Sequence, residues 1–562
     1  MKKLVGILAL VVVVLAGATV FVFTRPPKAP ATPHIVMIVV DTLRADHVGA
    51  YGYARPTTPN VDALASRGML FENVYPPTSW TVPSMASMFT GLNPQRHGII
   101  QGLQIFGQIA YQHQLGNAHD TLAERLAGAG YLTLGYSTNV HITRTTGFGQ
   151  GFEIFEEATS ANAEYVEELV DADLPKLATA VREAKPYFLY LHFFDPHTPY
   201  LPREPFFQKI APDADQKILL DVNPSQGDLM SSFPRGFFSK NQLHLQALRD
   251  VYDSEIAACD DVIGRILGKL PGLENAYVLF VSDHGEAFSE HDTMLHGYDL
   301  FEGTLRVPLI IAPPSAPNAP RPYEVAAGKK VATRVGVVDV MPTLLGMAGI
   351  TAQDLDGANL LANVPEKRAL PLHLHRGPVA AYGAIQYPWK VIVDKAAETT
   401  MLYNLESDPT EKTNLAPGQA VPDDLMKAAE AADVIAPKIP AVLVRNQHVA
   451  NEDQLKSLGY LTGGGDDESK KPAAPGEATP APTPDVPWVV DLQLCDRVRA
   501  VKAKCDKVAD ALARDACVNE GLDAIKKDTC PKAKSYDHKK KCEFMRLDPT
   551  LRICSQVDAA KK

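Results

Sequence analysis

The stretch HIVMIVVD, residues 34–41, decides the fold of this chain. Its apolar residues run unbroken from Ile35 to Val40, most of them β-branched, and Asp41 ends the run. A continuous apolar strand is typical of a parallel sheet that helices cover on both faces. Runs of the same kind recur as YLTLGYS (131–137), PYFLYLHFF (186–194), AYVLFVSD (276–283) and VPLIIA (307–312).

Segments with helical periodicity lie between these runs, for example residues 61–67, 121–128 and 242–269. Strands that alternate with helices predict an α/β fold, in which a central, mostly parallel sheet lies between two layers of helices. In such sheets ligands bind beyond the carboxyl ends of the strands.

Polar side chains stand at these strand ends. Each one alone is explained as well by a helix cap or a turn, but four clusters at one edge of one sheet favour a functional site. A hydroxyl at Thr81, just before a helix that Pro83 helps to start, adds a fifth candidate near the same place. The clusters are Asp41; Asn139 with His141; Asp195 with His197; and Asp283 with His284.

The composition of the whole chain narrows the class of protein. It has 562 residues, of which 46% are hydrophobic and 22% charged, as is ordinary for a globular protein. A wholly disordered or collagen-like chain is therefore excluded. The 55 Lys and Arg residues against 66 Asp and Glu give a net charge of −11. We expect no nucleic-acid partner, because such proteins present a basic surface.

Residues 1–33 predict a membrane anchor followed by a Pro-rich stalk. The run from Leu4 to Phe23 contains no charge and is long enough for the ~30 Å hydrocarbon core of a bilayer. Lys2 and Lys3 favour a cytoplasmic N-terminus, which makes the chain a single-pass protein of the cell membrane with its body on the periplasmic or extracellular side. The alternative is a signal peptide cleaved after Ala18.

The C-terminal end predicts a small separate module. Residues 463–487, rich in Gly, Pro and Ala, indicate an extended linker. Residues 488–562 then hold six of the seven cysteines, spaced about twelve residues apart, which in an exported protein indicates a helical module with three disulfide bonds. Its binding partner cannot be named from the sequence. The seventh cysteine, Cys259, is interpreted as a buried apolar residue.

The body of the chain resembles the sulfatase family of the alkaline phosphatase superfamily. The resemblance follows the family's order over residues 34–460. It implies an α/β sandwich, here assigned to residues 34–348, and a smaller C-terminal α+β subdomain, here residues 349–462. The stretches that carry it are VDTLRADH (40–47), TVPSMASMFTG (81–91), RHG (96–98), DPHTPY (195–200), SDHGE (282–286), HG (296–297) and LYNL (402–405).

The resemblance implies a role for each matching residue. Asp41, Asp283 and His284 resemble the ligands of a divalent metal, and Thr81 takes the position of the nucleophile, which also approaches the metal. The remaining positions correspond to residues that contact the leaving group or the anionic group of the ester. At one of them, Asn139, the family often has a lysine. These positions are Asn139, His141, His197 and His296.

Two departures from the family pattern bear on the reaction. Sulfatases proper oxidise a Cys or Ser to formylglycine in a C/S-x-P-x-R context, but this chain has Thr81 and Met85 in those places. Threonine cannot form that aldehyde, so formylglycine is not expected. Thr81 instead resembles the nucleophile of the superfamily's phosphodiesterases and phosphoethanolamine or phosphoglycerol transferases. In addition, Thr42 stands where many sulfatases place another Asp ligand.

These features predict a metal-dependent hydrolase or transferase of phosphodiesters or phosphomonoesters. With an imidazole ligand, the site favours Mn²⁺ or Zn²⁺ over Ca²⁺ or Mg²⁺. The substrate is expected to be a small-molecule, lipid or glycan ester. A sulfuric ester hydrolase is the alternative within enzymes. A degenerate sulfatase-like binding or scaffold protein is the alternative of another class.

Overall fold

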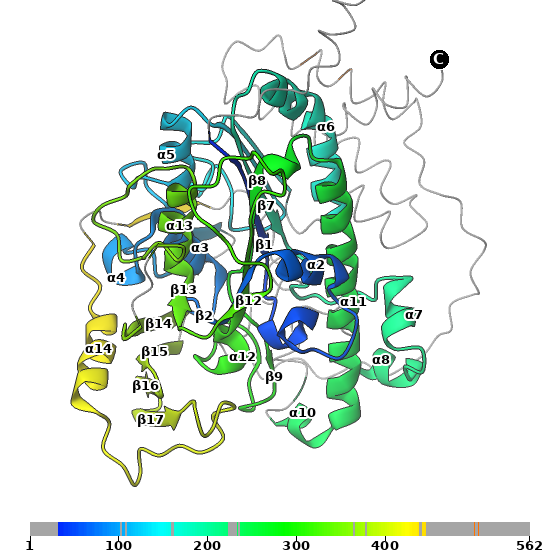
Figure 1. Ribbon diagram of the computed structural model, residues 1–562. Coiled ribbons are helices and arrows are strands. Elements are labelled where there is room, and N and C mark those ends of the chain that lie inside the picture. The colour runs from blue at the N-terminus through cyan, green and yellow to red at the C-terminus, as the bar shows by residue number, and fades with distance from the viewer. Residues whose placement is uncertain are drawn as a thin grey trace, which may run out of the picture.

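The computed structural model describes residues 32–101, 104–106, 109–158, 162–222, 233, 236–362, 366–376, 379–437 and 441–445, with residues 500 and 504. In the described chain a nine-stranded sheet forms the centre (Figure 1). Its strand order is β12-β2-β11-β8-β1-β7-β5-β6, and β13 pairs with β2. The strands are β1 (His34–Val40), β2 (Met69–Tyr75), β5 (Leu132–Ser137), β6 (Ile154–Glu157), β7 (Tyr187–Phe193), β8 (Ala276–Ser282), β11 (Val307–Ala312), β12 (Lys329–Val331) and β13 (Val335–Gly336).

The α/β class is confirmed, and the sheet is mixed. The strands β5, β7, β1 and β8 are parallel, as predicted, and β6, which the sequence did not indicate, is parallel to β5. β11 departs from the prediction, because it runs antiparallel to both β8 and β2. The connection from β8 contains a short hairpin, β9 (Ala287–Phe288) and β10 (Met294–Leu295), and only a four-residue helix, α12 (Glu302–Leu305). It therefore lacks the longer helix that usually crosses the face of a sheet between two parallel strands.

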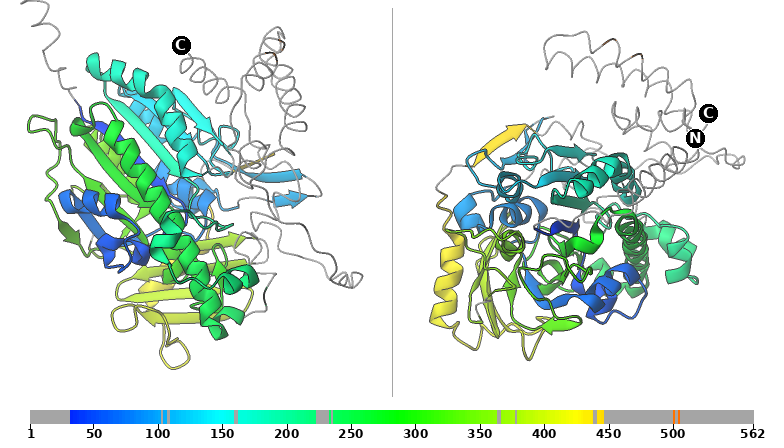
Figure 2. Two further views of the ribbon diagram at one scale, coloured as in Figure 1. Left: turned by 90° about the vertical axis from the view of Figure 1, so that its right-hand side faces the viewer. Right: turned by 45° about the horizontal axis from the view of Figure 1, so that its top comes forward.

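Helices cover both faces of the sheet, which explains why β1 is apolar from Ile35 to Val40. Ile35, Met37 and Val39 pack with α3 (Thr81–Thr90), α5 (Leu122–Gly128) and α13 (Val340–Met347). The alternate residues Val36, Ile38 and Val40 pack on the other face with α2 (Pro59–Arg67), α6 (Ala163–Arg182) and α11 (Gln242–Lys269). α6 and α11 lie side by side across that face (Figure 2).

Shorter elements surround this core. The helices α7 (Phe206–Ile210), α8 (Gln216–Val222) and α10 (Phe237–Lys240) pack against α11. α4 (Pro94–His97) follows α3, and β3 (Gln104–Phe106), β4 (Ile109–Gln114) and β18 (Val442–Arg445) form a small antiparallel sheet.

A smaller α+β unit follows the main sheet. Its four antiparallel strands are β14 (Leu370–Arg376), β15 (Val379–Gln386), β16 (Trp389–Asp394) and β17 (Thr399–Asn404). α14 (Asp423–Asp433) covers one face of this sheet through Leu425 and Ala429. The other face contacts the main body, where Leu372 and Leu374 share a cluster with Trp80. This contact brings β14 next to the residue that precedes Thr81.

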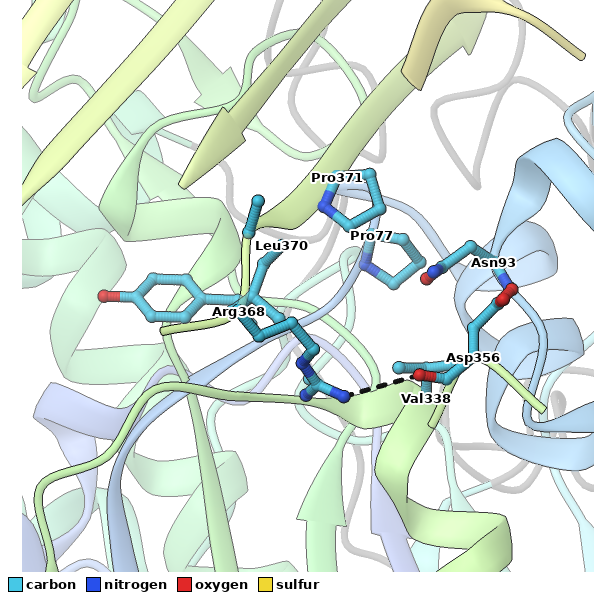
Figure 3. A pocket seen from close by; sticks show the side chains of 10 residues that line it. Pro77, Asn93, Val338, Asp356, Arg368, Leu370 and Pro371 are labelled. Carbon is cyan, nitrogen blue, oxygen red and sulfur yellow. Dashed lines mark hydrogen bonds between the residues drawn. The ribbon is translucent and has the colours of Figure 1, made fainter. Parts of the chain in front are cut away.

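A cavity of about 20 Å³ lies at this junction, lined by Pro77, Asn93, Asp356, Arg368 and Pro371 among others (Figure 3). That volume holds about one water molecule, which is too little for a substrate. Arg368 also forms an ion pair with the fully buried Asp339. The junction is therefore a packed, ion-paired contact between the two parts.

Of the predicted anchor and stalk (1–33), the structure describes residues 32 and 33 alone, and the linker (463–487) and the Cys-rich module (488–562, apart from residues 500 and 504) lie outside the described residues. Among the helices that the structure describes, none combines the length and the apolar character needed to cross a bilayer. The interpretation of Cys259 is confirmed: it is buried on α11, and burial raises the pKa of its thiol well above the usual value.

Candidate active site

The strand order brings the predicted metal ligands together. β8 is the parallel neighbour of β1, with Ser282 level with Val40, so Asp41 and Asp283 emerge side by side from two strand ends. His284 follows directly. Asp41, Asp283 and His284 are all fully buried and offer ligand atoms within 4.8 Å of one another. The prediction that these distant segments meet at one edge of the sheet is thus confirmed.

The three side chains present donor atoms around a common centre. His284 Nε2 lies 3.7 Å from Asp41 Oδ1 and 3.4 Å from Asp283 Oδ2. Atoms bound at about 2.0–2.2 Å to one tetrahedral ion are separated by about this much. Within the described residues, neither of these carboxylate oxygens has a hydrogen-bond partner, although both are buried. The arrangement fits a divalent cation.

The electrostatics of the site agree with this fit. Burial raises the pKa of Asp41, and the nearby charge of Asp283 raises it further. Burial raises the pKa of Asp283 as well. Two buried carboxylates therefore repel each other, and a cation between them would relieve the repulsion. His284 donates its Nδ1–H to the carbonyl of Gly285 over 2.9 Å, which leaves the Nε2 lone pair facing the carboxylates.

Thr81 is the first residue of α3 and reaches the same centre. Its Oγ1 lies 3.2 Å from His284 Nε2, and the side chain is buried. The neighbouring serines are engaged elsewhere: Ser84 donates to the carbonyl of Asp283, and Ser79 donates to the carbonyl of Asp299. Of these three hydroxyls, that of Thr81 is the one beside the metal-ligand atoms.

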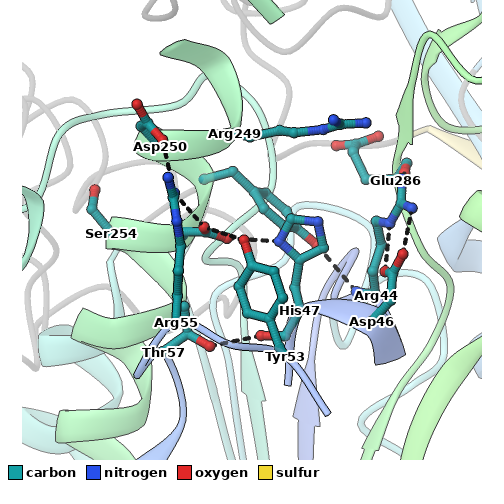
Figure 4. A network of polar contacts seen from close by, with 12 residues as sticks. Arg44, Asp46, His47, Tyr53, Arg55, Thr57, Arg249, Asp250, Ser254 and Glu286 are labelled. Carbon is teal, nitrogen blue, oxygen red and sulfur yellow. Dashed lines mark hydrogen bonds and ion pairs between the residues drawn. The ribbon is translucent and has the colours of Figure 1, made fainter. Parts of the chain in front are cut away.

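The loop after β1 is held in an unusual conformation next to the site. Thr42 has a φ of 55°, a left-handed conformation that costs a β-branched residue energy. Its carbonyl accepts a hydrogen bond from the hydroxyl of Tyr252 on α11. Further along, His47 and Arg55 both bind the buried Asp253 of α11 (Figure 4). This network fixes the loop and hence the direction of Asp41.

Asn139 is placed against a metal ligand. Its Nδ2 donates to Asp41 Oδ2, and its Oδ1 accepts the backbone N–H of His141 over 2.7 Å. The amide thus holds one oxygen of Asp41 and leaves the other for a cation. At this position, where the sulfatase family often has a lysine, the residue is neutral and acts on Asp41.

Three further histidines surround His284. The rings of His284 and His296 are 4.6 Å apart, and those of His296 and His197 are 4.7 Å apart. His141 lies against Trp80. Burial lowers the pKa of His141 and His197 to about 3 and also lowers that of His296, so these imidazoles are neutral at pH 7. The structure therefore gathers all the histidines predicted from the sequence.

Sequence reasoning missed three side chains that join this group. Glu286 accepts Nδ1–H of His296 over 2.9 Å and the hydroxyl of Tyr200 over 2.8 Å, and burial raises its pKa to about 8. Glu286 and Tyr200 stood inside stretches already quoted for the resemblance. His192, on β7, lies buried with Nε2 3.8 Å from Asp41 Oδ2. Nothing in its strand distinguished it from a core residue.

Comparisons with known proteins agree with this fold. Residues 33–350 match the family described as Sulfatase, and the chain belongs to that family. A choline-sulfatase of Rhizobium meliloti is 26% identical over 456 residues, which cover 70% of this chain and 84% of that protein. An arylsulfatase of Clostridium perfringens is 25% identical over 452 residues, covering 68% and 90%.

Solved structures show the same architecture. A phosphonate monoester hydrolase of Agrobacterium radiobacter superposes with a TM-score of 0.51 at 20% identity, covering 71% of this chain and 93% of that one. A protein solved with its substrate D-glucosamine-2-N,6-O-disulfate superposes with a TM-score of 0.55, also at 20% identity, covering 71% and 97%. The chain thus shares the fold of these proteins and belongs to a family of metal-dependent ester hydrolases.

Proposed function

We propose that this protein is a metal-dependent hydrolase or transferase of phosphate esters, with Thr81 as its nucleophile. The observation that carries the proposal is the position of the Thr81 hydroxyl, 3.2 Å from His284 Nε2 at the start of α3. A threonine cannot be converted to formylglycine. Met85, where sulfatases proper have a supporting Arg, is instead a fully buried core residue.

Each residue of the site has its own role in a two-step displacement. Asp41, Asp283 and His284 would hold the cation, which when bound lowers the pKa of a neighbouring hydroxyl and neutralises ester oxygens. The Oγ1–P bond of Thr81 forms while the bond from phosphorus to the leaving oxygen breaks. A neutral imidazole among His141, His197 and His296 takes the proton of the Thr81 hydroxyl and gives it to that oxygen. Water, or an acceptor alcohol in a transferase, then gives its proton to the imidazole as it attacks phosphorus, and the proton returns to Oγ1 of Thr81 as the threonine ester breaks.

The donor set favours Zn²⁺ or Mn²⁺ as the metal. It combines one imidazole nitrogen with carboxylate and hydroxyl oxygens, whereas Ca²⁺ and Mg²⁺ prefer shells made of oxygen only. The substrate we propose is a small-molecule, lipid or glycan ester outside the cytoplasm. That location depends on the predicted anchor in residues 1–33.

Sulfate-ester hydrolysis is the second candidate, favoured by the similarity to a choline-sulfatase and an arylsulfatase. The two candidates differ in how the covalent intermediate is broken down. A formylglycine diol expels sulfate without water attacking sulfur, but a threonine ester needs direct attack by water. The neutral histidines and the unmodified hydroxyl suit the second route.

A substrate screen tests the proposal. The purified chain would be assayed on nitrophenyl sulfate, phosphate, phosphonate and phosphodiester, each with Zn²⁺, Mn²⁺, Ca²⁺ or Mg²⁺. We expect turnover of a phosphate ester with Zn²⁺ or Mn²⁺ and poor turnover of the sulfate. A strong preference for aryl sulfate would replace the proposal with the sulfatase alternative. Metal binding without turnover of any ester would favour the binding or scaffold protein.

Replacement of Thr81 tests the nucleophile directly. Thr81→Ala should reduce kcat by at least ~10³-fold, as for the loss of a covalent nucleophile, and Thr81→Ser should keep part of the activity. Thr90→Ala is the matched control, because Thr90 is a buried hydroxyl at the other end of α3 that bonds the carbonyl of Ala86. Near-normal turnover by Thr81→Ala would exclude this mechanism.

A further inference from the structure

The carboxyl group of Glu286 joins two of the loops that surround the predicted site. Its Oε1 accepts Nδ1–H of His296 over 2.9 Å, and its Oε2 accepts the hydroxyl of Tyr200 over 2.8 Å. All three side chains are buried, those of Glu286 and Tyr200 fully. Each oxygen of Glu286 thus has a partner, whereas Asp41 Oδ1 and Asp283 Oδ2 have none among the described residues. The position of Glu286 is therefore that of a group that orients its neighbours.

The backbone on both sides of the Glu286–His296 hydrogen bond is also held. The N–H of Glu286 donates to the carbonyl of Gly303 over 3.1 Å, and its carbonyl accepts Nη1 of Arg44 over 2.9 Å. Nη1 of Arg376, the last residue of β14, donates to the carbonyl of His296 over 2.7 Å. Because both residues are anchored in this way, the hydrogen bond between their side chains fixes the orientation of the imidazole ring.

The His296 ring lies close to the reacting groups. It stands between the rings of His284 and His197, whose centres are 4.6 and 4.7 Å away. His284 Nε2 in turn lies 3.2 Å from Oγ1 of Thr81. Since Nδ1 of His296 is directed at Glu286, Nε2 on the opposite side of the ring is the nitrogen left for proton transfer. It has no hydrogen-bond partner among the described residues.

His296 differs from His197 in the partner of Nδ1. His197 donates Nδ1–H to the neutral backbone carbonyl of Thr198, whereas His296 donates to the carboxyl of Glu286. When an imidazole takes up a proton, a carboxylate partner stabilises the resulting cation more than a carbonyl does, because the hydrogen bond is then charge-assisted. This difference favours His296 over His197 as the group that carries a proton.

We infer that Glu286 is the positioning residue of His296, and that His296 is the imidazole that carries the proton from Thr81 to the leaving oxygen. The hydroxyl proton of Thr81 moves to Nε2 as the Oγ1–P bond forms, and moves on to the leaving oxygen as its bond to phosphorus breaks. Glu286 holds the Nδ1–H throughout, and Tyr200 holds the second oxygen of Glu286. The inference deepens the proposed function and rests on ester cleavage at Thr81.

Two esters with the same phosphate and different leaving groups test the inference: methyl phenyl phosphate and methyl 4-nitrophenyl phosphate. Both give the same methyl phosphate ester of Thr81, so they differ in the first step, which kcat/KM reports. Phenolate is more basic than nitrophenolate and needs the proton more. The zinc-loaded enzyme is assayed at pH 9, because burial raises the pKa of Glu286 to about 8 and the carboxyl must be ionised.

Glu286→Gln keeps the shape of the side chain and removes its charge. We expect it to lower kcat/KM about 10²-fold for the phenyl ester, as for a loss of general acid catalysis, and less than tenfold for the nitrophenyl ester. Asp253→Asn is the matched control, because Asp253 also accepts a histidine, His47, and a tyrosine hydroxyl, that of Tyr53. Asp253 supports the loop after β1, so any loss in this variant should be equal for the two esters.

A double variant tests whether Glu286 acts through His296. In a His296→Asn background, Glu286→Gln should cause no further loss. Tyr200→Phe leaves the carboxyl in place and should show the same preference for the nitrophenyl ester at smaller size. It replaces Glu286→Gln as the test if metal analysis or circular dichroism shows that Glu286→Gln has lost its metal or its fold.

Equal losses on the two esters, no loss on either, or additive losses in the double variant would each overturn the inference. The same two leaving groups are also tested as aryl sulfates. If only the sulfates are turned over, the phosphate-ester proposal fails, while the ratio between the phenyl and nitrophenyl compounds still tests Glu286. The two failures are thus distinguishable.

Discussion

Replacing Asn139 with alanine tests how the site prepares Asp41 for a metal. The change removes the Nδ2 donor to Asp41 Oδ2 and the acceptor of the His141 N–H. Each of the two buried groups left without a partner costs about 1–3 kcal/mol, so the free energy of unfolding should fall by about 2–6 kcal/mol. Losing the group that orients a ligand should also weaken metal binding about 10–100-fold.

Zinc titration by calorimetry on the metal-free protein, together with urea unfolding, measures both effects. Asn60→Ala is the matched control: Asn60 Nδ2 also donates to a buried aspartate, Asp260, over 2.9 Å, but outside the site. Asp260 keeps the backbone N–H groups of Asn60 and Val61 as donors. The control should therefore lose only about 1 kcal/mol of stability and no zinc affinity. Wild-type zinc affinity in Asn139→Ala, or an equal loss in Asn60→Ala, would refute the reasoning.

Two further predictions concern the metal and acid stability. Asp283→Asn should abolish bound metal and activity while circular dichroism shows an intact fold; metal analysis of the purified variant checks this, and full metal content would contradict it. Burial lowers the pKa of His34 to about 4. Below about pH 6.5 the unfolded chain binds a proton at His34 that the folded chain does not bind. The free energy of unfolding should therefore decrease as the pH is lowered from 6.5 to 4. His34→Asn should flatten that slope in urea titrations, and an unchanged slope would count against it.

The parallel strands at the centre of the sheet could be predicted because the sequence pattern that indicates them is local. The unbroken apolar run of β1 and the polar residues that follow β1 and β8 depend only on neighbouring positions in the sequence. Once two such strands are adjacent and parallel, Asp41 and Asp283 must share an edge of the sheet. The antiparallel direction of β11 escaped prediction because it depends on a connection that no periodic pattern marks.

The supporting residues escaped prediction for a different reason. Arg376 and His296 are 80 positions apart, and their contact depends on how the smaller sheet packs against the main body. Glu286 and Tyr200 come from different loops and meet through the hydrogen bond from the Tyr200 hydroxyl to Glu286, which also accepts from His296. Such contacts are set by tertiary packing, so a residue's own neighbours in the sequence give no signal of its role.

Two departures of this chain from the sulfatase pattern, Asn139 and Met85, place an uncharged side chain where the family has a positive one. Asn139 is neutral, Met85 is apolar, and burial keeps the surrounding imidazoles neutral at pH 7. An anionic ester placed beside Asp41 and Asp283 would therefore meet net negative charge unless a divalent cation is bound there. The charge of the ester would then be balanced by the cation that Asp41, Asp283 and His284 hold.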